Sequence, residues 1–262
     1  MKTVHVHPWG GVLKVKYSSS AIIFLQELEI LEYLIFYLLV SDRVFYARYE
    51  NFREESLDYI KSLGPKFKET FDQIVVSKAD RLLFRSKTYE NLLSQMAYSR
   101  SVDNFILYLK NILAEIIEVK PQLLKSGEKE RLDYILNFDD IVELRRALAD
   151  KKIESLFYSG FKDIFEFYES RIGIKLSDKT DDIEKFILMT KIRNLIVHNG
   201  GKINSEFKKA FPKYPFEVGE SLKLSFKEIL EDNYFILRSV DSIDSKITGK
   251  FGLSLVPVKN SN

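Results

Sequence analysis

The sequence predicts an all-α protein, built as an antiparallel bundle of long helices. Apolar residues recur at helical spacing over long stretches of the chain. Only six prolines occur in 262 residues, and Pro65 and Pro121 fall where helical patterns end. The sequence contains no evident internal repeat and no low-complexity tract. These features are typical of a helical bundle with short connections.

The amino-terminal part of the chain is expected to begin irregularly and then become helical. The hydroxyl groups of Ser18 and Ser20 are suited to an N-cap. Gly64 and Pro65 end a helical pattern, because proline blocks helix continuation. The elements predicted here are an irregular segment over 1–17, helices over 18–41 and 42–63, and an amphipathic segment over 66–86.

The remaining chain is predicted to consist mainly of helices. One should end before Pro121, and another at Gly173. Asp181 marks the first turn of the next, where negative charge complements the helix dipole. Gly219, between short apolar runs, indicates a small hairpin near 214–224. The predicted helices cover 87–119, 151–171, 179–198 and 225–246, with two shorter segments between 129 and 150.

The composition excludes several classes of protein. The absence of cysteine excludes a disulfide framework, a thiol nucleophile and a zinc site with thiolate ligands. The net charge of +2 gives little general attraction to nucleic acid, so an RNA contact requires a local cluster. The apolar stretch 21–40 contains Glu27, Glu29 and Glu32, which are costly in a bilayer. We therefore expect a soluble, cytoplasmic protein that makes no membrane contact.

We expect three parts in the chain. They are a helical extension of unknown role over 1–86, a helical bundle over 87–251 and a tail over 252–262. His5 and His7 would point to one side of a strand, but no third ligand is evident. We therefore expect neither a metal site nor a cofactor.

The helix predicted over 179–198 carries apolar residues on two sides. On a helix with about 100° per residue, two separate groups of positions emerge. The group expected to face the core is Leu188, Ile192, Leu195 and Ile196. The group on the opposite, outward side is Ile183, Phe186, Thr190 and Val197. A helix that is apolar on two sides is normally sandwiched, so we expect the outward side to form a dimer interface or to pack on another part of the chain.

The same helix carries Arg193 and His198 and ends at Gly200 and Gly201. The two side chains diverge by about 140°, which prevents them from acting on one substrate atom as a simple pair. Either the last turn is distorted, or two copies of the helix meet and line one cleft. A purely structural interpretation also exists: cationic side chains stabilise a helix carboxyl end, and the glycines supply a left-handed cap.

The run RNLIVHN, from Arg193 to Asn199, resembles the signature of the HEPN superfamily (higher eukaryotes and prokaryotes nucleotide-binding). That signature is an arginine, usually followed by a polar residue, and a histidine with four to six residues between it and the arginine. Here Asn194 follows the arginine, and four residues separate Arg193 from His198. The segments 160–176 and 200–204 also resemble the parts of HEPN proteins that flank this motif.

The resemblance implies an α-helical bundle that homodimerises through the motif helix. Many members are metal-independent endoribonucleases of toxin–antitoxin, antiviral-defence or RNA-processing systems. In these, the ribose 2′-OH attacks the adjacent phosphate and leaves a 2′,3′-cyclic phosphate and a 5′-hydroxyl. Carried over, His198 would be the general acid or base and Arg193 would hold the phosphate. Asn194 would orient the imidazole or donate to the phosphate, and Asp103 or Glu90 could supply an assisting carboxylate.

Three lysines directly after the motif are candidate contacts to RNA phosphates. They are Lys202, Lys208 and Lys209. The expected partners are an RNA substrate, a second copy of the chain, and an antitoxin or a defence-system protein. Two alternatives remain open: a non-catalytic HEPN module that binds a protein or a nucleotide, and a purely structural helical domain.

Overall fold

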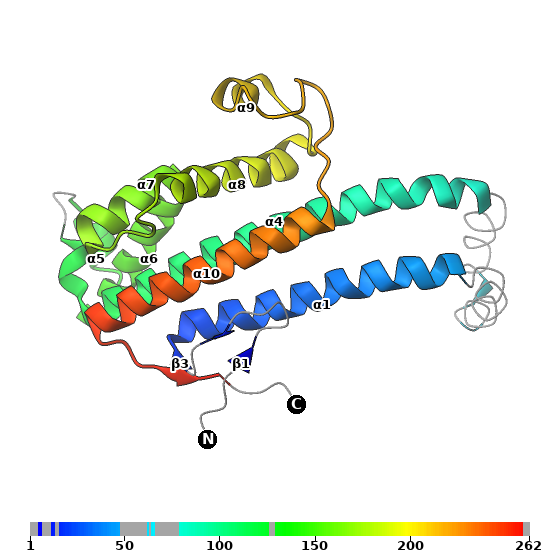
Figure 1. Ribbon diagram of the computed structural model, residues 1–262. Helices are drawn as coiled ribbons and strands as arrows, with labels where there is room; N and C mark the ends of the chain where they lie inside the picture. Colours follow the sequence, from blue (N-terminus) through cyan, green and yellow to red (C-terminus); the bar gives the residue numbers. More distant parts are fainter. Residues whose placement is uncertain are drawn as a thin grey trace.

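A computed structural model describes residues 5–6, 12–13, 16–47, 62, 64–65, 79–125 and 129–258, and it confirms the all-α fold class (Figure 1). The long helices are α1 (Ser19–Ala47), α4 (Ala79–Val119), α6 (Ile141–Ser159), α8 (Thr180–Asn199) and α10 (Phe226–Phe251). The short helical elements are η2 (Pro121–Leu124), α5 (Leu132–Ile135), α7 (Phe161–Phe167), the π-helix η3 (Tyr168–Ile172) and α9 (Ser205–Ala210). The strands are β1 (His5–Val6), β2 (Val12–Leu13), β3 (Lys16–Tyr17) and β4 (Val256–Pro257).

The long helices lie alongside one another around α4. Figure 1 shows that α1 and α8 run antiparallel to α4, whereas α10 runs in the same direction as α4. Helices α1, α6, α8 and α10 all pack on α4. The strands form two short antiparallel pairs, β1 with β2 and β3 with β4.

An aromatic cluster lies where α4, α7, α8 and α10 meet. The Phe186 ring stacks on Phe105 with 4.7 Å between ring centroids, and Phe235 lies at the same distance on another side. Phe161 and Phe165 of α7 complete the cluster. Aromatic side chains bury large apolar areas, so this cluster fixes the middle of α8 against the rest of the bundle.

The predicted division into an extension, a bundle and a tail differs from the structure. The boundary at residue 86 falls inside the continuous helix α4. Helix α1 packs on both α4 and α10, and Tyr17 donates a hydrogen bond from its hydroxyl to Asp241, 3.0 Å away. Strand β3 pairs with β4 in the predicted tail. One hydrophobic core therefore joins all three predicted parts. The helices predicted over 42–63 and 66–86 lie largely outside the described residues.

The helix predicted over 151–171 is interrupted at Gly160. Helix α6 starts after Asp140, whose carboxylate accepts hydrogen bonds from the backbone of Val142 and Glu143, and it continues to Ser159. Gly160 has φ 125°, a conformation that favours glycine, and α7 starts directly after it. The chain changes direction here, so that α7 packs on α6 and α8.

The hairpin predicted near 214–224 is absent from this described segment. Gly219 does lie in a tight turn, closed by a hydrogen bond from the Glu220 N–H to the Glu217 carbonyl. The residues that follow the turn pair instead with residues 201–203, directly after the end of α8. Ile203 exchanges backbone hydrogen bonds with residues 219 and 220, and Lys202 forms an antiparallel bridge with Ser221.

The buried side of α8 also differs from the expected one. Its buried residues are Phe186, Met189, Ile192 and Leu195. Leu188, placed at the centre of the core side, is only half-buried, whereas Phe186, placed on the outward side, is 1% exposed. The proposed dimer contact through Phe186 is therefore wrong, because its ring fills the aromatic cluster. Of the other outward residues, Val197 is exposed and Ile183 and Thr190 are half-buried.

The two sides of α8 can be compared by substituting one residue on each. We expect Phe186→Ala to lower the free energy of unfolding by about 3–5 kcal/mol, because it leaves a cavity between four other rings. Val197→Ala should change it by no more than about 0.5 kcal/mol, because Val197 is exposed. Urea unfolding of both variants measures these differences. Equal losses would contradict the assignment of Phe186 to the core.

Candidate functional site

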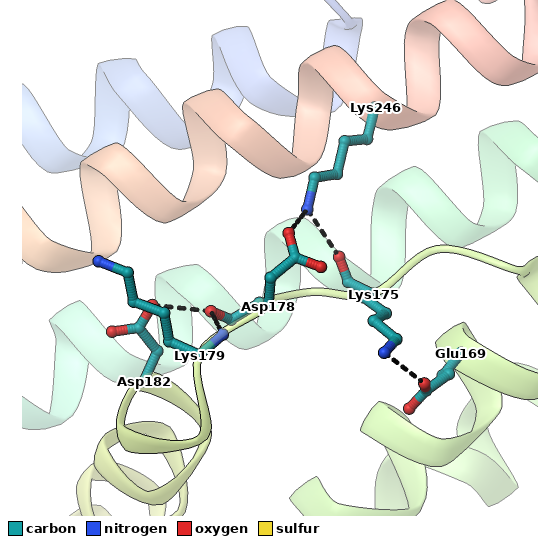
Figure 2. Close-up of polar contacts among 7 residues, drawn as sticks. Glu169, Lys175, Asp178, Lys179, Asp182 and Lys246 are labelled. Carbon is teal, nitrogen blue, oxygen red and sulfur yellow. Dashed lines mark hydrogen bonds and ion pairs between the residues drawn. The ribbon is translucent and has the colours of Figure 1, made fainter.

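The amino end of the motif helix α8 is held by contacts to α10 (Figure 2). Lys246 donates from Nζ to Asp178 Oδ2 at 2.9 Å and to the Lys175 carbonyl at 3.3 Å. The Lys246 ammonium lowers the pKa of Asp178, by hydrogen bonding first and by its charge second. Inside the loop, Ser177 Oγ donates to Asp182 Oδ2 at 2.7 Å. The loop before α8 is thereby attached to the bundle.

The other end of α8 is held by α4. Gly200 and Gly201 both have positive φ, at 59° and 70°, and end the helix as predicted. A Cβ added to Gly201 would lie 2.5 Å from Gln95 Oε1, so any other residue here requires the Gln95 side chain to move. Gln95 in turn donates from Nε2 to the Leu222 carbonyl, 2.9 Å away. Gln95 therefore fixes the exit of the motif helix, a role that nothing in the sequence pattern indicated.

The guanidinium of Arg193 is paired with a carboxylate on α4. Nε of Arg193 donates to Asp103 Oδ1 at 2.7 Å, and Nη1 donates to Asn194 Oδ1 at 3.2 Å. The Arg193 side chain is 26% exposed and that of Asp103 is 36% exposed, so the pair is open to solvent on one side. Nη2 makes no hydrogen bond to the described residues and remains the donor available to a ligand. Asp103 is one of the two carboxylates singled out from the sequence; the side chain of the other, Glu90, lies outside the described residues.

His198 lies in the last turn of α8 and is exposed. Among the described residues, the imidazole makes no hydrogen bond and no ion pair. Helix α8 continues to Asn199, so the last turn is not distorted before the glycines. Arg193 and His198 therefore keep the divergence of about 140° that a regular helix imposes. The structure does not bring them together within one chain.

The three candidate lysines have different environments. Lys202 and Lys209 are exposed beside the end of the motif helix and on α9. Lys208 is engaged inside the chain: Nζ donates to the carbonyls of Tyr214 and Phe216 and to Glu217 Oε1. Lys208 thus ties α9 to the segment that follows it, whereas Lys202 and Lys209 are free to meet a polyanion.

A second group of titratable residues lies between α4, α8 and α10. Lys185 donates to Asp232 at 2.8 Å and lies 4.5 Å from the Phe235 ring centre. Burial raises the pKa of Asp232, and the attraction of Lys185 only partly offsets this effect. Burial, followed by the charges of Glu228 and Asp232, raises the pKa of Tyr214 to about 12. The phenol of Tyr214 therefore stays protonated at neutral pH and cannot act as a base.

The described residues contain no group of three or more side chains that could hold a metal ion. The side chains of His5 and His7 lie outside the described part. Within the described part, no helix is long and apolar enough to cross a membrane.

The packing of Gly201 on Gln95 can be tested by comparing alanine substitutions at Gly201 and at the adjacent Gly200. Alanine at either Gly200 or Gly201 costs about 1–2 kcal/mol because of the left-handed backbone. Gly201→Ala should cost about 0.5–1.5 kcal/mol more, because Gln95 must move and lose its hydrogen bond to Leu222. Space around Gly200 is open, which makes Gly200→Ala the matched control. Equal unfolding midpoints in urea would show that Gln95 does not hold the end of α8.

The raised pKa of Asp232 has a consequence for stability. The folded protein binds a proton at Asp232 more tightly than the unfolded chain, so stability falls as pH rises from about 4 through the folded-state pKa. Asp232→Asn removes this dependence. We expect its unfolding free energy, relative to the wild type, to increase over that pH range. Urea unfolding at a series of pH values measures this difference, and a constant difference would contradict the assignment.

No known protein family, curated protein or solved structure matches this chain in the comparisons made with it.

Proposed function

We propose that this protein is a HEPN-like, metal-independent endoribonuclease of the toxin or antiviral-defence type. The observation that carries the proposal is the pairing of Arg193 with Asp103, on the same helix whose last turn carries the exposed His198. An arginine and a histidine on one helix, with the arginine oriented by a carboxylate, supply a phosphate ligand and a proton-transfer group without a metal.

Arg193 is suited to hold a phosphate because its orientation is fixed. The ion pair with Asp103 and the hydrogen bond to Asn194 occupy Nε and Nη1. A phosphate approaching Nη2 would meet a guanidinium whose orientation is already set, and fixed donors stabilise developing charge better than mobile ones. In this scheme Asn194 contributes by positioning Arg193. This differs from the role at the imidazole or the phosphate that the resemblance implied.

His198 would transfer the proton. A neutral imidazole can accept the proton of the attacking 2′-OH, and its protonated form can donate to the leaving 5′-oxygen. Because Arg193 and His198 diverge on one helix, we infer that the reactive pair is formed from two copies of the chain. Lys202 and Lys209 would then contact phosphates that flank the cleaved bond.

The proposal predicts RNA cleavage in excess EDTA that depends on His198. Wild-type protein should leave 2′,3′-cyclic phosphate ends, and His198→Ala should lower the rate by about 10²–10⁴-fold, the usual contribution of general acid–base catalysis. Because His198 is exposed, its loss should change stability by about 1 kcal/mol at most. Denaturing gels and analysis of the RNA ends measure the outcome.

The matched control is Glu184→Gln, an exposed position near the other end of the same helix. It should cleave as the wild type does. If varied RNAs stay intact with folded wild-type protein, the nuclease proposal fails. The non-catalytic HEPN module, which binds a protein partner or a nucleotide, then becomes the better hypothesis. Toxicity on overproduction that persists in His198→Ala would also contradict the nuclease.

A further inference from the structure

We propose that the outward side of α1, together with the adjoining part of α4, is the surface through which two copies of this chain associate. This inference concerns the contact between copies and holds whether or not the protein cleaves RNA. It is separate from the contact through α8 that the nuclease proposal requires, because α4 and α10 lie between α1 and α8 and an α1 contact does not bring two motif helices together (Figure 1). We do not expect α8 alone to hold a stable dimer, since Val197 is the one large apolar residue among its described residues that is exposed.

Helix α1 is apolar on two opposite sides. Its inward side packs on α4 and α10 through buried residues such as Leu28 and Ile35. At about 100° per residue, the outward residues lie roughly 100–180° away from these two. The outward group is Ile23, Ile30, Tyr33, Leu34, Tyr37 and Val40, which are 41–67% exposed. A helix with apolar residues on both sides is normally covered on both sides.

The outward residues repeat with the spacing of a helix-packing seam. Ile23, Ile30 and Tyr37 lie seven positions apart. Tyr33 and Val40, three positions after Ile30 and Tyr37, are also seven positions apart. Such a heptad pattern matches a partner helix that presents the same pattern. A second copy of α1 meets this condition by symmetry, because an isologous contact pairs a surface with itself.

Helix α4 widens the surface. Arg100 forms an ion pair with Glu27 of α1, which shows that this side of α4 faces α1. Met96 and Leu92 lie one and two turns before Arg100 on the same side, and they are 59% and 53% exposed. Figure 1 shows that the later part of α1 and the first part of α4 extend side by side beyond the ends of α8 and α10, so those two helices do not cover this part of the surface.

The area and the charge of this surface fit a protein partner. The two tyrosines have roughly 150–250 Å² of surface each when free and the six aliphatic and methionine side chains have less, so eight half-exposed side chains offer about 700 Å². This is about the area that each partner buries in an interface of standard size. An anionic membrane fits less well, because Glu27 and Glu29 lie near this surface and Arg100 is paired with Glu27. Helix α1 itself carries one arginine and no lysine, so it has no polybasic cluster.

Sedimentation velocity on the full-length protein at micromolar concentration tests the proposal. The wild type should sediment as a dimer, and Ile30→Glu combined with Tyr37→Glu should shift it to a monomer with an unchanged circular dichroism spectrum. The control is Leu132→Glu combined with Leu136→Glu, which adds the same two charges at residues of and next to α5 that are 69% and 73% exposed. This variant should remain dimeric.

A cross-linking experiment gives an independent result, because the chain contains no cysteine. Ile30 lies at the middle of the stripe from Ile23 to Tyr37, so it faces its own copy in either a parallel or an antiparallel pair. Ile30→Cys should therefore form a disulfide-linked dimer on mild oxidation, whereas Leu136→Cys should not.

Three outcomes would overturn the proposal. The first is a monomeric wild type that binds no liposomes, in which case residues 48–78 of the same chain become the better occupant. The second is a monomeric wild type that binds liposomes through this surface. The third is a dimer that both glutamate substitutions leave intact. None of these outcomes depends on RNA cleavage, so failure of this inference is distinguishable from failure of the nuclease proposal.

Discussion

The burial of α4 between the other long helices is the constraint on which the rest of the described structure depends. Residues such as Phe105, Leu109 and Ile112 are completely or almost completely buried, and α1, α6, α8 and α10 each pack on this helix. The same helix supplies Asp103 to Arg193 and Gln95 to the end of α8. The position of the motif helix is thus set at two points by α4, and any shift between the two helices would separate both contacts together.

Helix ends were predictable where a strong local signal marks them. Without such a signal they were not: α1 and α10 continue to Ala47 and Phe251, beyond the predicted ends at 41 and 246, and α4 begins at Ala79, before the predicted start at 87. The motif helix begins and ends within one residue of its predicted bounds, since acidic residues favour its start and two glycines end it. Pro121 likewise ends α4 as expected. The break at Gly160 was not predicted, because glycine is tolerated inside a helix and only the packing of α7 requires the turn.

Packing across the chain was much less predictable. On α8 the buried residues from Phe186 to Leu195 recur every three positions, so the buried side winds around the helix and no single face describes it. Its first half meets the aromatic cluster and its second half meets α4. Arg193 and His198 could be named as candidates from a local motif. The carboxylate that pairs with Arg193 lies 90 positions away, and the sequence left two candidates for it, Asp103 and Glu90.

The pairing of the two distant ends of the described chain affects how the protein can fold during synthesis. Tyr17 and Ser18 bond to Asp241 and Asp244, and β3 pairs with β4, so these contacts span more than 220 positions. Because chains leave the ribosome from the amino end, α1 is made long before α10 exists to cover it. Its apolar inward side must first be covered by α4 and can be enclosed only after α10 has been synthesised. Such non-local closure slows folding and prolongs the time during which this helix is open to the wrong partners.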